Sequence, residues 1–479
     1  MQNYLPLNPT DRKPSSGHPA IQIPPLAVFN KLTTLNPDKS AGPDDIPCWL
    51  LKEYADILAI PISSILNSSF TEENVPSVWK SANVVPIPKV KPVKDINNDL
   101  RPISLTPVLA KLAEEFVIER QLKQAMKSVI KDDQFGGLDK SSAPMALLSM
   151  LHNWSSNTDG NGSCVRTILF DFRKAFDLVD HQILVKKLQH LNISTPTLNW
   201  IMDFLTNRRQ RVKVSTAFSE WQHVPAGVPQ GSKLGPWLFL LMINDLSITP
   251  SFTLWKYIDD TTLSETIKKG ASSSLQSAVN TIHEWASTNR FEIHPTKTKE
   301  LRFDFTKDSH NHDPIQVDER LIEKVQSAKL LGLIISSDLK WNAHIEYVVS
   351  KASKRLYFLI QLKRARIQEK ELCSFYIACI RSVVEYACEV YHFNLPQYLS
   401  EFLERIQKRA LSFILPQTKY EEAFALLEIE TLKSRRTTKC IKLIEDITSN
   451  NSHKLACLLP PKHEISYNLR KRCNIYMQI

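Results

Sequence analysis

Residues 253–263 read TLWKYIDDTTL, in which two β-prone stretches flank the adjacent acids Asp259 and Asp260. This pattern predicts a β-hairpin that carries both carboxylates at its turn. Adjacent like charges repel one another unless solvent or a cation screens them. Because acidic pairs are also common in ordinary solvated turns, this pair indicates a site only if other parts of the chain support it.

A third acid ends another β-prone stretch. Residues 165–172 read VRTILFDF, which predicts a buried strand that leads to Asp171. Magnesium prefers oxygen ligands and typically uses one or two carboxylates together with substrate phosphates. Asp171 and Asp259 therefore suit two such ions, which in phosphoryl transfer activate an attacking hydroxyl and stabilise the leaving pyrophosphate.

The remaining patterns alternate between helix and strand up to about residue 335. Thr106 and Pro107 are expected to start a long amphipathic helix that reaches about Ile130. Residues 84–88 are β-prone, but their two prolines suit an edge strand or a loop. The other expected elements are a basic extended segment at 208–215, a loop at 227–231, an apolar helix at 237–246, strands at 301–305 and 330–335, and helices from residue 342 onward. This order predicts an α/β part followed by an all-α part.

Composition narrows the class of protein. The 479 residues are 43% hydrophobic and 23% charged, which excludes a wholly disordered chain. There are 60 Lys and Arg against 50 Asp and Glu, a net charge of +10 that is typical of proteins that meet phosphates. Neither a P-loop nor a G-x-G-x-x-G motif occurs. No Cys-x-x-Cys pair occurs, and we expect the cysteines to be reduced thiols. No apolar run of about 20 residues occurs either, so we expect no secretion signal and no membrane insertion.

Three motifs contain or adjoin the acids: LFDFRKAFD at 169–177, GVPQGSKLGP at 227–236 and YIDD at 257–260. Supporting motifs are VVPIPK at 84–89, RPISL at 101–105, HPTKT at 294–298, KLLG at 329–332 and DLKW at 338–341. With these motifs in this order, the chain from about Ser40 to about Arg436 resembles the reverse transcriptases of LINE-type (non-LTR) retrotransposons, most closely the Jockey and chicken-repeat group.

The resemblance implies a right-hand polymerase of the α/β (α+β) class. Fingers and a palm with an antiparallel sheet are followed by an all-α thumb and a helical C-terminal extension. The corresponding segments are a flexible leader at 1–25, an N-terminal helical extension and fingers at 26–165, a palm at 166–340, a helical thumb at 341–436 and a tail at 437–479, with the reverse transcriptase core at about 70–340.

The resemblance also assigns roles to residues. The catalytic acids, which bind two Mg²⁺ or Mn²⁺ ions, are Asp171, Asp259 and Asp260. The residues expected to bind the dNTP, with Phe176 as the steric gate against a 2′-hydroxyl, are Lys89, Arg101, Phe176, Gln230 and Lys297. The residues expected to contact nucleic acid, including a primer-grip turn at Gly332, are Tyr257, Gly332, Lys351, Lys354, Arg355, Lys363 and Arg364.

Simpler interpretations stay open for several of these residues. Phe176 also suits a hydrophobic core, and Gln230 also suits an ordinary loop amide. Arg101 could instead form a surface ion pair with Asp99. The basic residues from Lys351 to Arg366 also suit a solvated helix face, opposite an apolar face formed by Leu356, Phe358, Leu359 and Leu362.

Two further acids are left out of the expected site. Asp180 suits the N-cap of a helix, because its side chain can accept hydrogen bonds from the first turn. Asp177 is expected to pair with Arg173 or Lys174 across one helical turn.

The implied activity is RNA-directed DNA polymerisation, in which a primer 3′-hydroxyl attacks a dNTP on an RNA template. Family members of full length carry an endonuclease, and some carry zinc knuckles. Neither is found here, so we expect the polymerase part of a truncated or decayed element that works in the nucleus or cytoplasm. A degenerate or domesticated copy that binds nucleic acid without polymerising is the alternative, and the presence of the three acids argues against it. Asp139 lies in a segment that is commonly more basic in the family, and it would be mildly unfavourable beside a template. A viral RNA-dependent RNA polymerase is disfavoured by YIDD and by the bulky Phe176.

Overall fold

A computed structural model describes residues 4, 7, 12–14, 19–160, 162–306 and 312–460. Contacts between its residues divide the chain into two compact units. Unit 1 consists of Met1–Gly137, Asp171–Thr249 and Ala278–His294. Unit 2 consists of Leu138–Phe170, Pro250–Ser277 and Pro295–Ile479. The boundary at residues 277 and 278 falls inside α11 (Leu275–Thr288).

Unit 1 combines helices with a small sheet. Its helices include α1 (Pro25–Thr33), α2 (Cys48–Glu53), α3 (Ala55–Thr71), α4 (Ile96–Asp99), α5 (Val108–Val117), α6 (Lys123–Lys127), α8 (His181–Leu188), α9 (Thr195–Leu205), α10 (Leu234–Asn244) and the 3₁₀ turn η2 (Ser77–Lys80). Its strands are ordered β2-β1-β4-β5, with β6 also on β4, and comprise β1 (Ser81–Pro88), β2 (Leu100–Leu105), β4 (Arg209–Val214), β5 (Ala217–Phe218) and β6 (Gln222–His223).

The prediction of an edge strand or loop at residues 84–88 holds for residues 85–88, which pair with β2 alone, although the first half of β1 lies between β2 and β4. The parallel pairing with β4 uses Ser81 to Val84 only. Pro86 and Pro88 lie beyond that ladder and face β2 alone. A proline lacks the N–H of a ladder, so the end of the β4 pairing at Val84 is what permits these prolines in a central strand.

The long helix expected after residue 106 is present but begins one residue later. Pro107 is the N-cap of α5 instead of its first residue, and the side chain of Thr106 is not the cap. The helix continues through the π-helical η3 (Ile118–Leu122) into α6. Leu112, Phe116 and Met126 are buried, as their helical spacing predicted.

The described part of the expected leader is tied to unit 1. Arg12 forms an ion pair with Asp203, and Ile21 and Ile23 are buried. The expectation of a flexible leader is therefore corrected for these residues. The apolar pair Ile21 and Ile23 explains the difference, because burying such side chains offsets the entropy lost on ordering the chain.

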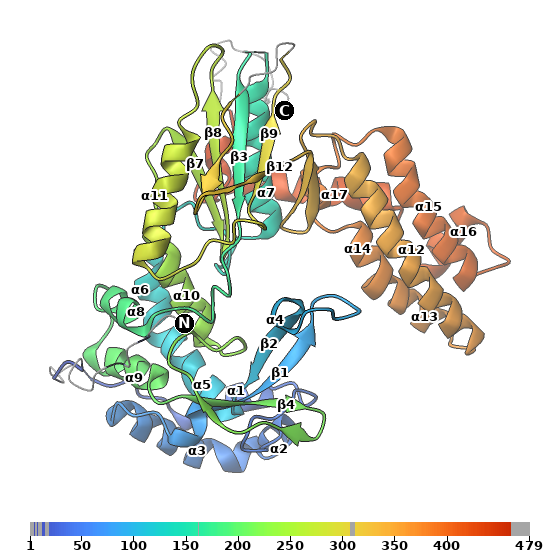
Figure 1. Ribbon diagram of the computed structural model, residues 1–479. Coiled ribbons are helices and arrows are strands. Elements are labelled where there is room, and N and C mark those ends of the chain that lie inside the picture. The colour runs from blue at the N-terminus through green and yellow to red at the C-terminus, as the bar shows by residue number, and fades with distance from the viewer. Residues whose placement is uncertain are drawn as a thin grey trace, which may run out of the picture. The chain divides into compact units, whose positions relative to one another are not determined.

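Unit 2 contains a mixed sheet in the order β12-β9-β3-β8-β7 (Figure 1). Its strands are β3 (Cys164–Phe170), β7 (Phe252–Tyr257), β8 (Asp260–Ile267), β9 (Lys299–Phe303) and β12 (Glu323–Val325). All neighbours are antiparallel except β12 and β9. The expected antiparallel sheet therefore gains one parallel strand at its edge.

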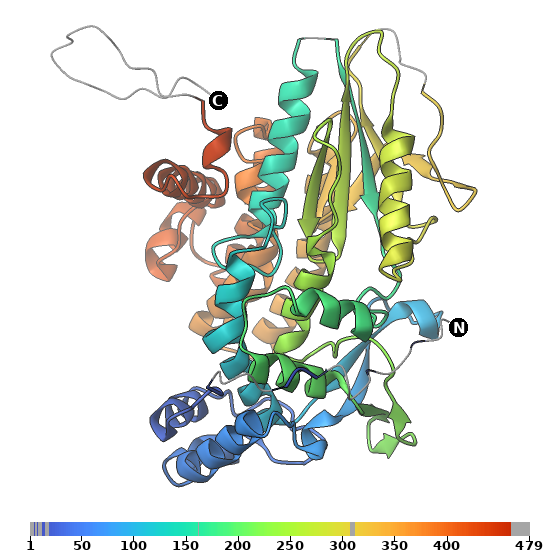
Figure 2. The ribbon, with the colours of Figure 1, turned by 90° about the vertical axis from the view of Figure 1, so that its left-hand side faces the viewer.

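Helix α7 (Ala143–Thr158) packs on this sheet, along which it runs in Figure 2. Trp154 of α7 stacks on Phe303 at 4.6 Å between ring centroids. Its Nε1 donates a hydrogen bond to the Ser264 hydroxyl at 2.9 Å. A fully buried tryptophan needs such a partner for its N–H, so this bond fixes the helix on the strands that carry the acidic turn.

The strand expected at 330–335 is instead a hairpin of β13 (Ser327–Leu330) and β14 (Leu333–Ser336). Its turn consists of Leu331 and Gly332, both with positive φ. A second small hairpin pairs β10 (Gln316–Val317) with β11 (Arg320–Leu321).

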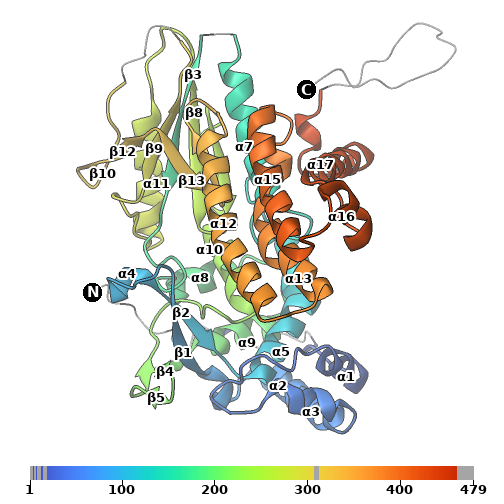
Figure 3. The same ribbon diagram turned by 90° about the vertical axis from the view of Figure 1, so that its right-hand side faces the viewer.

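The described residues after 342 are predominantly helical, as predicted. They form α12 (Asn342–Arg364), α13 (Glu369–Phe375), the π-helical η4 (Tyr376–Arg381), α14 (Ser382–Val384), η5 (Cys388–Val390), α15 (Gln397–Ile414), α16 (Tyr420–Leu427), α17 (Leu432–Ser449) and η6 (Ala456–Leu458). Helix α12 lies along α15 (Figure 3). Helix α17 passes through the boundary expected at residues 436 and 437. Residues 461–479 of the expected tail lie outside the described residues.

None of the described helices is both long and apolar enough to cross a membrane.

Candidate active site

The acidic pair lies at the tip of the predicted hairpin. Strand β7 ends at Tyr257, β8 begins at Asp260, and these two residues face each other across the ladder. Ile258 between them has a φ of 60°. Both aspartates are exposed, whereas the following Thr261 is buried. The sequence prediction of two carboxylates presented at a hairpin turn is therefore confirmed.

The strand that precedes Asp171 pairs with the strand that follows the acidic pair. Phe170, the last residue of β3, faces Thr261 of β8. Asp171 is the next residue along the chain, and its carbonyl accepts a hydrogen bond from the His294 amide at 2.7 Å. Within the described residues, no three His, Cys, Asp or Glu side chains are arranged to hold a metal ion by themselves.

Residues 173–178 after Asp171 form turns, and they place Phe176 half-buried. Its ring stacks on Phe239 of α10 with 4.4 Å between centroids and 13° between planes. The Phe176 carbonyl also accepts a hydrogen bond from the Val228 amide at 2.8 Å. Phe176 thus makes a core contact on one side and keeps part of its surface accessible, so the two interpretations of this residue are compatible.

The loop at 227–231 is attached to these turns by its backbone. Gly227 donates to the Val179 carbonyl at 2.8 Å, and its carbonyl accepts from His181 Nε2 at 2.7 Å. A Cβ at Gly227 would lie 2.7 Å from the Asp177 carbonyl oxygen, and its φ is +88°. Glycine is required at this position because both the space and the backbone conformation exclude a side chain.

Gln230 and Asp177 form a direct contact. Gln230 Nε2 donates to Asp177 Oδ1 at 3.0 Å, and its carbonyl accepts from the Ser104 amide at 2.7 Å. Burial raises the pKa of Asp177. The expected pairing of Asp177 with Arg173 or Lys174 is therefore wrong: the segment is a turn and not a helix, and Arg173 lies 3.8 Å from Glu292 instead. Asp180, in contrast, caps α8 as predicted.

A buried acid that the sequence analysis missed holds the other end of this loop. Glu114 of α5 is 0% exposed and accepts hydrogen bonds from the amides of Lys233 and Leu234, at 2.7 and 2.8 Å. Burial is the main cause that raises its pKa, and the nearby Arg208 opposes it. A glutamate among the apolar positions of an amphipathic helix was the available signal. This carboxylate satisfies the first amides of α10, which would otherwise be unpaired.

Arg208 belongs to this interior and not to the basic surface. It is 3% exposed, and its Nη1 donates to the Phe204 carbonyl at 2.9 Å. Burial lowers the pKa of Arg208 to about 10.

A cavity of about 390 Å³ lies beside the loop, within unit 1. Its polar and charged lining includes Lys174, Asp177, Arg209, Gln210, His223 and Gln230. The mixture of cations and hydrogen-bonding groups suits a polar, anionic ligand better than an apolar one.

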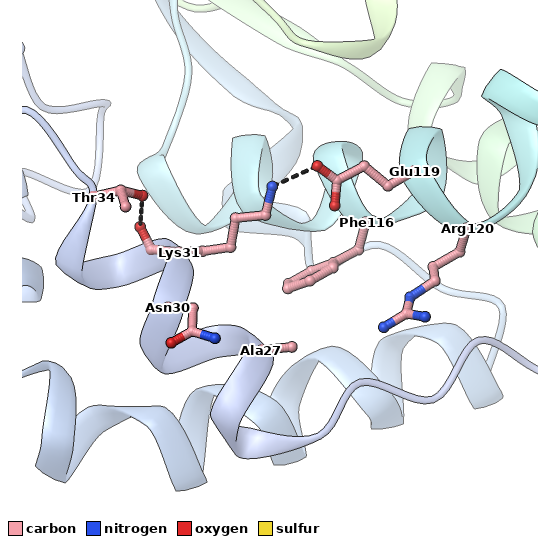
Figure 4. A pocket seen from close by; sticks show the side chains of 7 residues that line it. All are labelled: Ala27, Asn30, Lys31, Thr34, Phe116, Glu119 and Arg120. Atoms are coloured by element: carbon pink, nitrogen blue, oxygen red, sulfur yellow. Dashed lines mark hydrogen bonds and ion pairs between the residues drawn. The ribbon is translucent and has the colours of Figure 1, made fainter.

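A second cavity, of about 530 Å³, is formed by α1 and the α5–η3 segment (Figure 4). Lys31 reaches across it to Glu119 at 2.5 Å. None of the residues expected to bind metal, dNTP or nucleic acid lines it.

The other residues expected to bind the dNTP lie at element ends. Arg101 faces Ile87 across β1 and β2, is exposed, and makes no ion pair within the described residues, so the alternative pairing with Asp99 is not observed. Lys89 is exposed directly after β1. Lys297 is exposed in the turn before β9 and belongs to unit 2, whereas Lys89 and Arg101 belong to unit 1.

The turn expected to grip the primer is held by a tyrosine that the sequence analysis did not identify. The Tyr386 hydroxyl donates to the Leu331 carbonyl at 2.9 Å. A Cβ at Gly332, whose φ is +93°, would lie 2.8 Å from the Tyr386 ring. The preceding Glu385 is buried and pairs with Arg435 and with Lys439, the latter at 3.1 Å. Helix α17 thus fixes the segment that contacts the turn.

The basic residues of α12 do not form one uniform face. Lys351, Lys354 and Arg364 are exposed. Arg355 donates to the Cys379 carbonyl, and Lys363 donates to the Ile414 carbonyl at 2.9 Å, so these two hold neighbouring helices. Phe358 is exposed, although its spacing suggested the apolar face.

Comparison with known proteins decides the family. A family model described as reverse transcriptase (RNA-dependent DNA polymerase) matches residues 87–335, slightly more than half of the chain. The chain belongs to the reverse transcriptase family. A second model, described as the N-terminal part of alkylated DNA repair protein alkB homolog 8, matches the short range 341–382 and assigns no family.

Relatives of this reverse transcriptase come from mobile elements. The probable RNA-directed DNA polymerase from transposon BS of Drosophila melanogaster is 23% identical over 463 residues, which cover 92% of this chain and 51% of the relative. The RNA-directed DNA polymerase from mobile element jockey of the same species is 28% identical over 331 residues, 66% of this chain and 36% of the relative. The resemblance to LINE-type reverse transcriptases is confirmed. The chain spans about half, or less, of the length of these relatives.

Proposed function

We propose that this reverse transcriptase extends a DNA primer on an RNA template with dNTPs, as the polymerase of a non-LTR retrotransposon. The observation that carries the proposal is the strand register in unit 2. Phe170 faces Thr261, so the strand that leads to Asp171 pairs with the strand that follows the Asp259-Asp260 turn. Family membership supplies the reaction type, and the relatives named as RNA-directed DNA polymerases support the same template.

In this proposal the segment from residue 26 to 165 contributes the fingers, 166 to 340 the palm and 341 to 436 the thumb. The mixed sheet of unit 2 supports the palm assignment, because the acidic turn connects its edge strand β7 to the neighbouring strand β8. The helices after Asn342 support the thumb assignment.

Asp171, Asp259 and Asp260 would hold two Mg²⁺ or Mn²⁺ ions. Their carboxylate oxygens match the ligand preference of these ions, which take their remaining ligands from phosphates and water, so a closed protein cage is not needed. Bound ions would supply charge stabilisation for the transferring phosphate and lower the pKa of the attacking hydroxyl. The protein contributes the exposed placement of two adjacent carboxylates on a short turn, which fixes their separation.

The nucleotide would be held by cations and by shape. Lys89, Arg101 and Lys297 are exposed and suit contacts with a triphosphate. Gln230 is positioned by Asp177, and Phe176 is positioned by its stack on Phe239. A rigid ring beneath the sugar would reject a 2′-hydroxyl by overlap, which is how a site discriminates between two otherwise similar substrates.

The template and primer would be held through their phosphates. Lys351, Lys354 and Arg364 of α12 are exposed and suit such contacts, which carry no base information. Arg355 and Lys363 fit this role less well because their head groups already bond neighbouring helices. Tyr257 and Gly332 would contact the primer through the two turns that contain them.

The test compares two carboxylates at hairpin tips. Asp259→Ala should lower primer extension by orders of magnitude and leave the affinity for a primer–template nearly unchanged. Asp318 is an exposed acid in the turn between β10 and β11, so Asp318→Ala serves as the matched control and should extend the primer at the parent rate. If Asp259→Ala extends as fast as the control, the site assignment is wrong. If neither the parent nor the control extends any primer while both bind it, the chain is the degenerate copy.

A further inference from the structure

One face of β4 in unit 1 combines cations with aromatic rings. Arg209, Arg211 and Lys213 occupy alternate positions of the strand and therefore lie on the same face. The Arg211 guanidinium lies 4.0 Å from the Phe218 ring and 4.6 Å from the Trp221 ring. Arg209 lies 4.9 Å from Trp221, and Lys213 lies 5.5 Å from Phe218. We call these five residues the β4 face.

The neighbouring strand fixes the two guanidinium groups. In the parallel pairing, Arg209 faces Ser81 and Arg211 faces Asn83. Arg209 Nε donates to the Ser81 hydroxyl at 2.9 Å, and Arg211 Nε donates to Asn83 Oδ1 at 2.9 Å. Each arginine uses one donor for its position and keeps its terminal amino groups for a ligand. The β4 face is therefore organised before anything binds, which lowers the entropy cost of binding.

The three cations are not neutralised by the protein. Within the described residues, Arg209, Arg211 and Lys213 form no ion pair with a carboxylate. Alternate residues of a strand are roughly 7 Å apart, so the three charges form a row of closely spaced like charges. Such a row is unfavourable by itself and becomes favourable when a partner presents a matching row of negative charges.

The exposed ring indicates which polyanion fits. Phe218 is 46% exposed, although a phenyl ring gains more from burial. Proteins that bind single-stranded nucleic acid combine a basic track with aromatic side chains on which bases stack, whereas bases in a duplex are already stacked on one another. An acidic protein or a duplex would pair with the three cations but would offer no unstacked base to the Phe218 ring.

We propose that the β4 face binds single-stranded RNA, as the part of the template that has not yet been copied. The proposal rests on the function proposed above and extends it from the acidic turn to a second surface. Phosphates would contact Arg209, Arg211 and Lys213, and a base would stack on Phe218.

The test measures binding without dNTP and without extension. Fluorescence anisotropy with a labelled oligo(rA) of about 15 nucleotides gives the affinity at several salt concentrations. Phe218→Ala should weaken binding about tenfold, in line with the loss of one stacked base. Arg211→Gln combined with Lys213→Gln should reduce the slope of log affinity against log salt by about 1.4. Both substitutions change surface side chains, and unchanged melting temperatures establish that the variants are folded.

A matched control exists in unit 2. The Arg405 guanidinium of α15 lies 4.7 Å from the Phe402 ring, which is the same kind of pair outside the β4 face. Phe402→Ala should bind oligo(rA) like the parent. Equal affinities of Phe218→Ala and Phe402→Ala would overturn the proposal, and so would an equal loss of Phe218→Ala on a blunt duplex. A chain that binds oligo(rA) as predicted but extends no primer would leave this inference standing and overturn the proposed function instead.

Discussion

Replacing Glu114 by alanine tests whether a buried carboxylate holds the loop that positions Gln230. The substitution leaves the buried amide of Leu234 and the partly buried amide of Lys233 without their acceptor. A buried donor that loses its partner costs about 1–3 kcal/mol, so the two amides together cost about 2–6 kcal/mol. The nearby buried Arg208 loses its compensating charge as well, which places the expected loss in the upper half of this range.

The neighbouring Glu115 provides the matched control. Its partners Lys31 and Lys233 lie near the surface, at 2.8 and 3.9 Å, and its side chain is 31% exposed. Exposed ion pairs contribute about 0–1 kcal/mol, so Glu115→Ala should change stability little. Both residues lie within α5, so the effect of alanine on helix propensity is nearly the same in the two variants.

Thermal melting followed by tryptophan fluorescence measures the difference. A domain of 150–250 residues shifts by about 2–4 °C for each kcal/mol, so Glu114→Ala should melt roughly 10 °C below Glu115→Ala. Glu114→Gln keeps a side-chain acceptor and should fall between them. At a temperature where all variants are folded, Glu114→Ala should also raise the KM for dNTP, because the loop loses one of its attachments. Melting temperatures of Glu114→Ala and Glu115→Ala within 2 °C of each other would refute the reasoning.

Three further outcomes are expected. Phe176→Ala should raise the rate of ribonucleotide relative to deoxyribonucleotide incorporation, and an unchanged ratio in single-turnover assays would make this ring a core residue only. Lys351→Gln combined with Lys354→Gln should reduce the slope of log affinity for primer–template against log salt by about 1.4–1.8, equally for all template sequences. Equal slopes for the parent and the double variant would show that these side chains are only solvated and contact no phosphate. Tyr386→Phe removes one hydrogen bond to the β13–β14 turn, so it should raise the KM for primer–template about fivefold and change the KM for dNTP little. Tyr398→Phe removes a hydroxyl hydrogen bond elsewhere in the helical part and should leave the KM for primer–template unchanged.

Local patterns in the sequence predicted the elements that carry the site. The acidic hairpin, the strand before Asp171 and the Asp180 cap each depend on a few neighbouring residues. The alternation of residue types in strands and the preferences for helix caps were therefore sufficient to predict them. The long helix after residue 106 and the helical region after residue 342 follow from apolar spacing in the same way.

Contacts between distant residues could not be predicted in this way. The interior position of β1 depends on the parallel pairing of residue 81 with residue 209, which no local pattern encodes. Asp177 could not be assigned to Gln230 without knowing that the loop returns to the turn. Arg355 has the same helical spacing as Lys351 and Lys354, yet it bonds a carbonyl 24 residues away. The roles of Glu114 and Tyr386 likewise arise from tertiary contacts.

Incorporation of labelled dTTP on poly(rA) primed with oligo(dT), in the presence of Mg²⁺, tests the central claim most directly. The account predicts incorporation by the parent protein that depends on the divalent ion, persists in Asp318→Ala and falls by orders of magnitude in Asp259→Ala. Incorporation that is equally fast in Asp259→Ala, or incorporation that does not depend on the poly(rA) template, would contradict it.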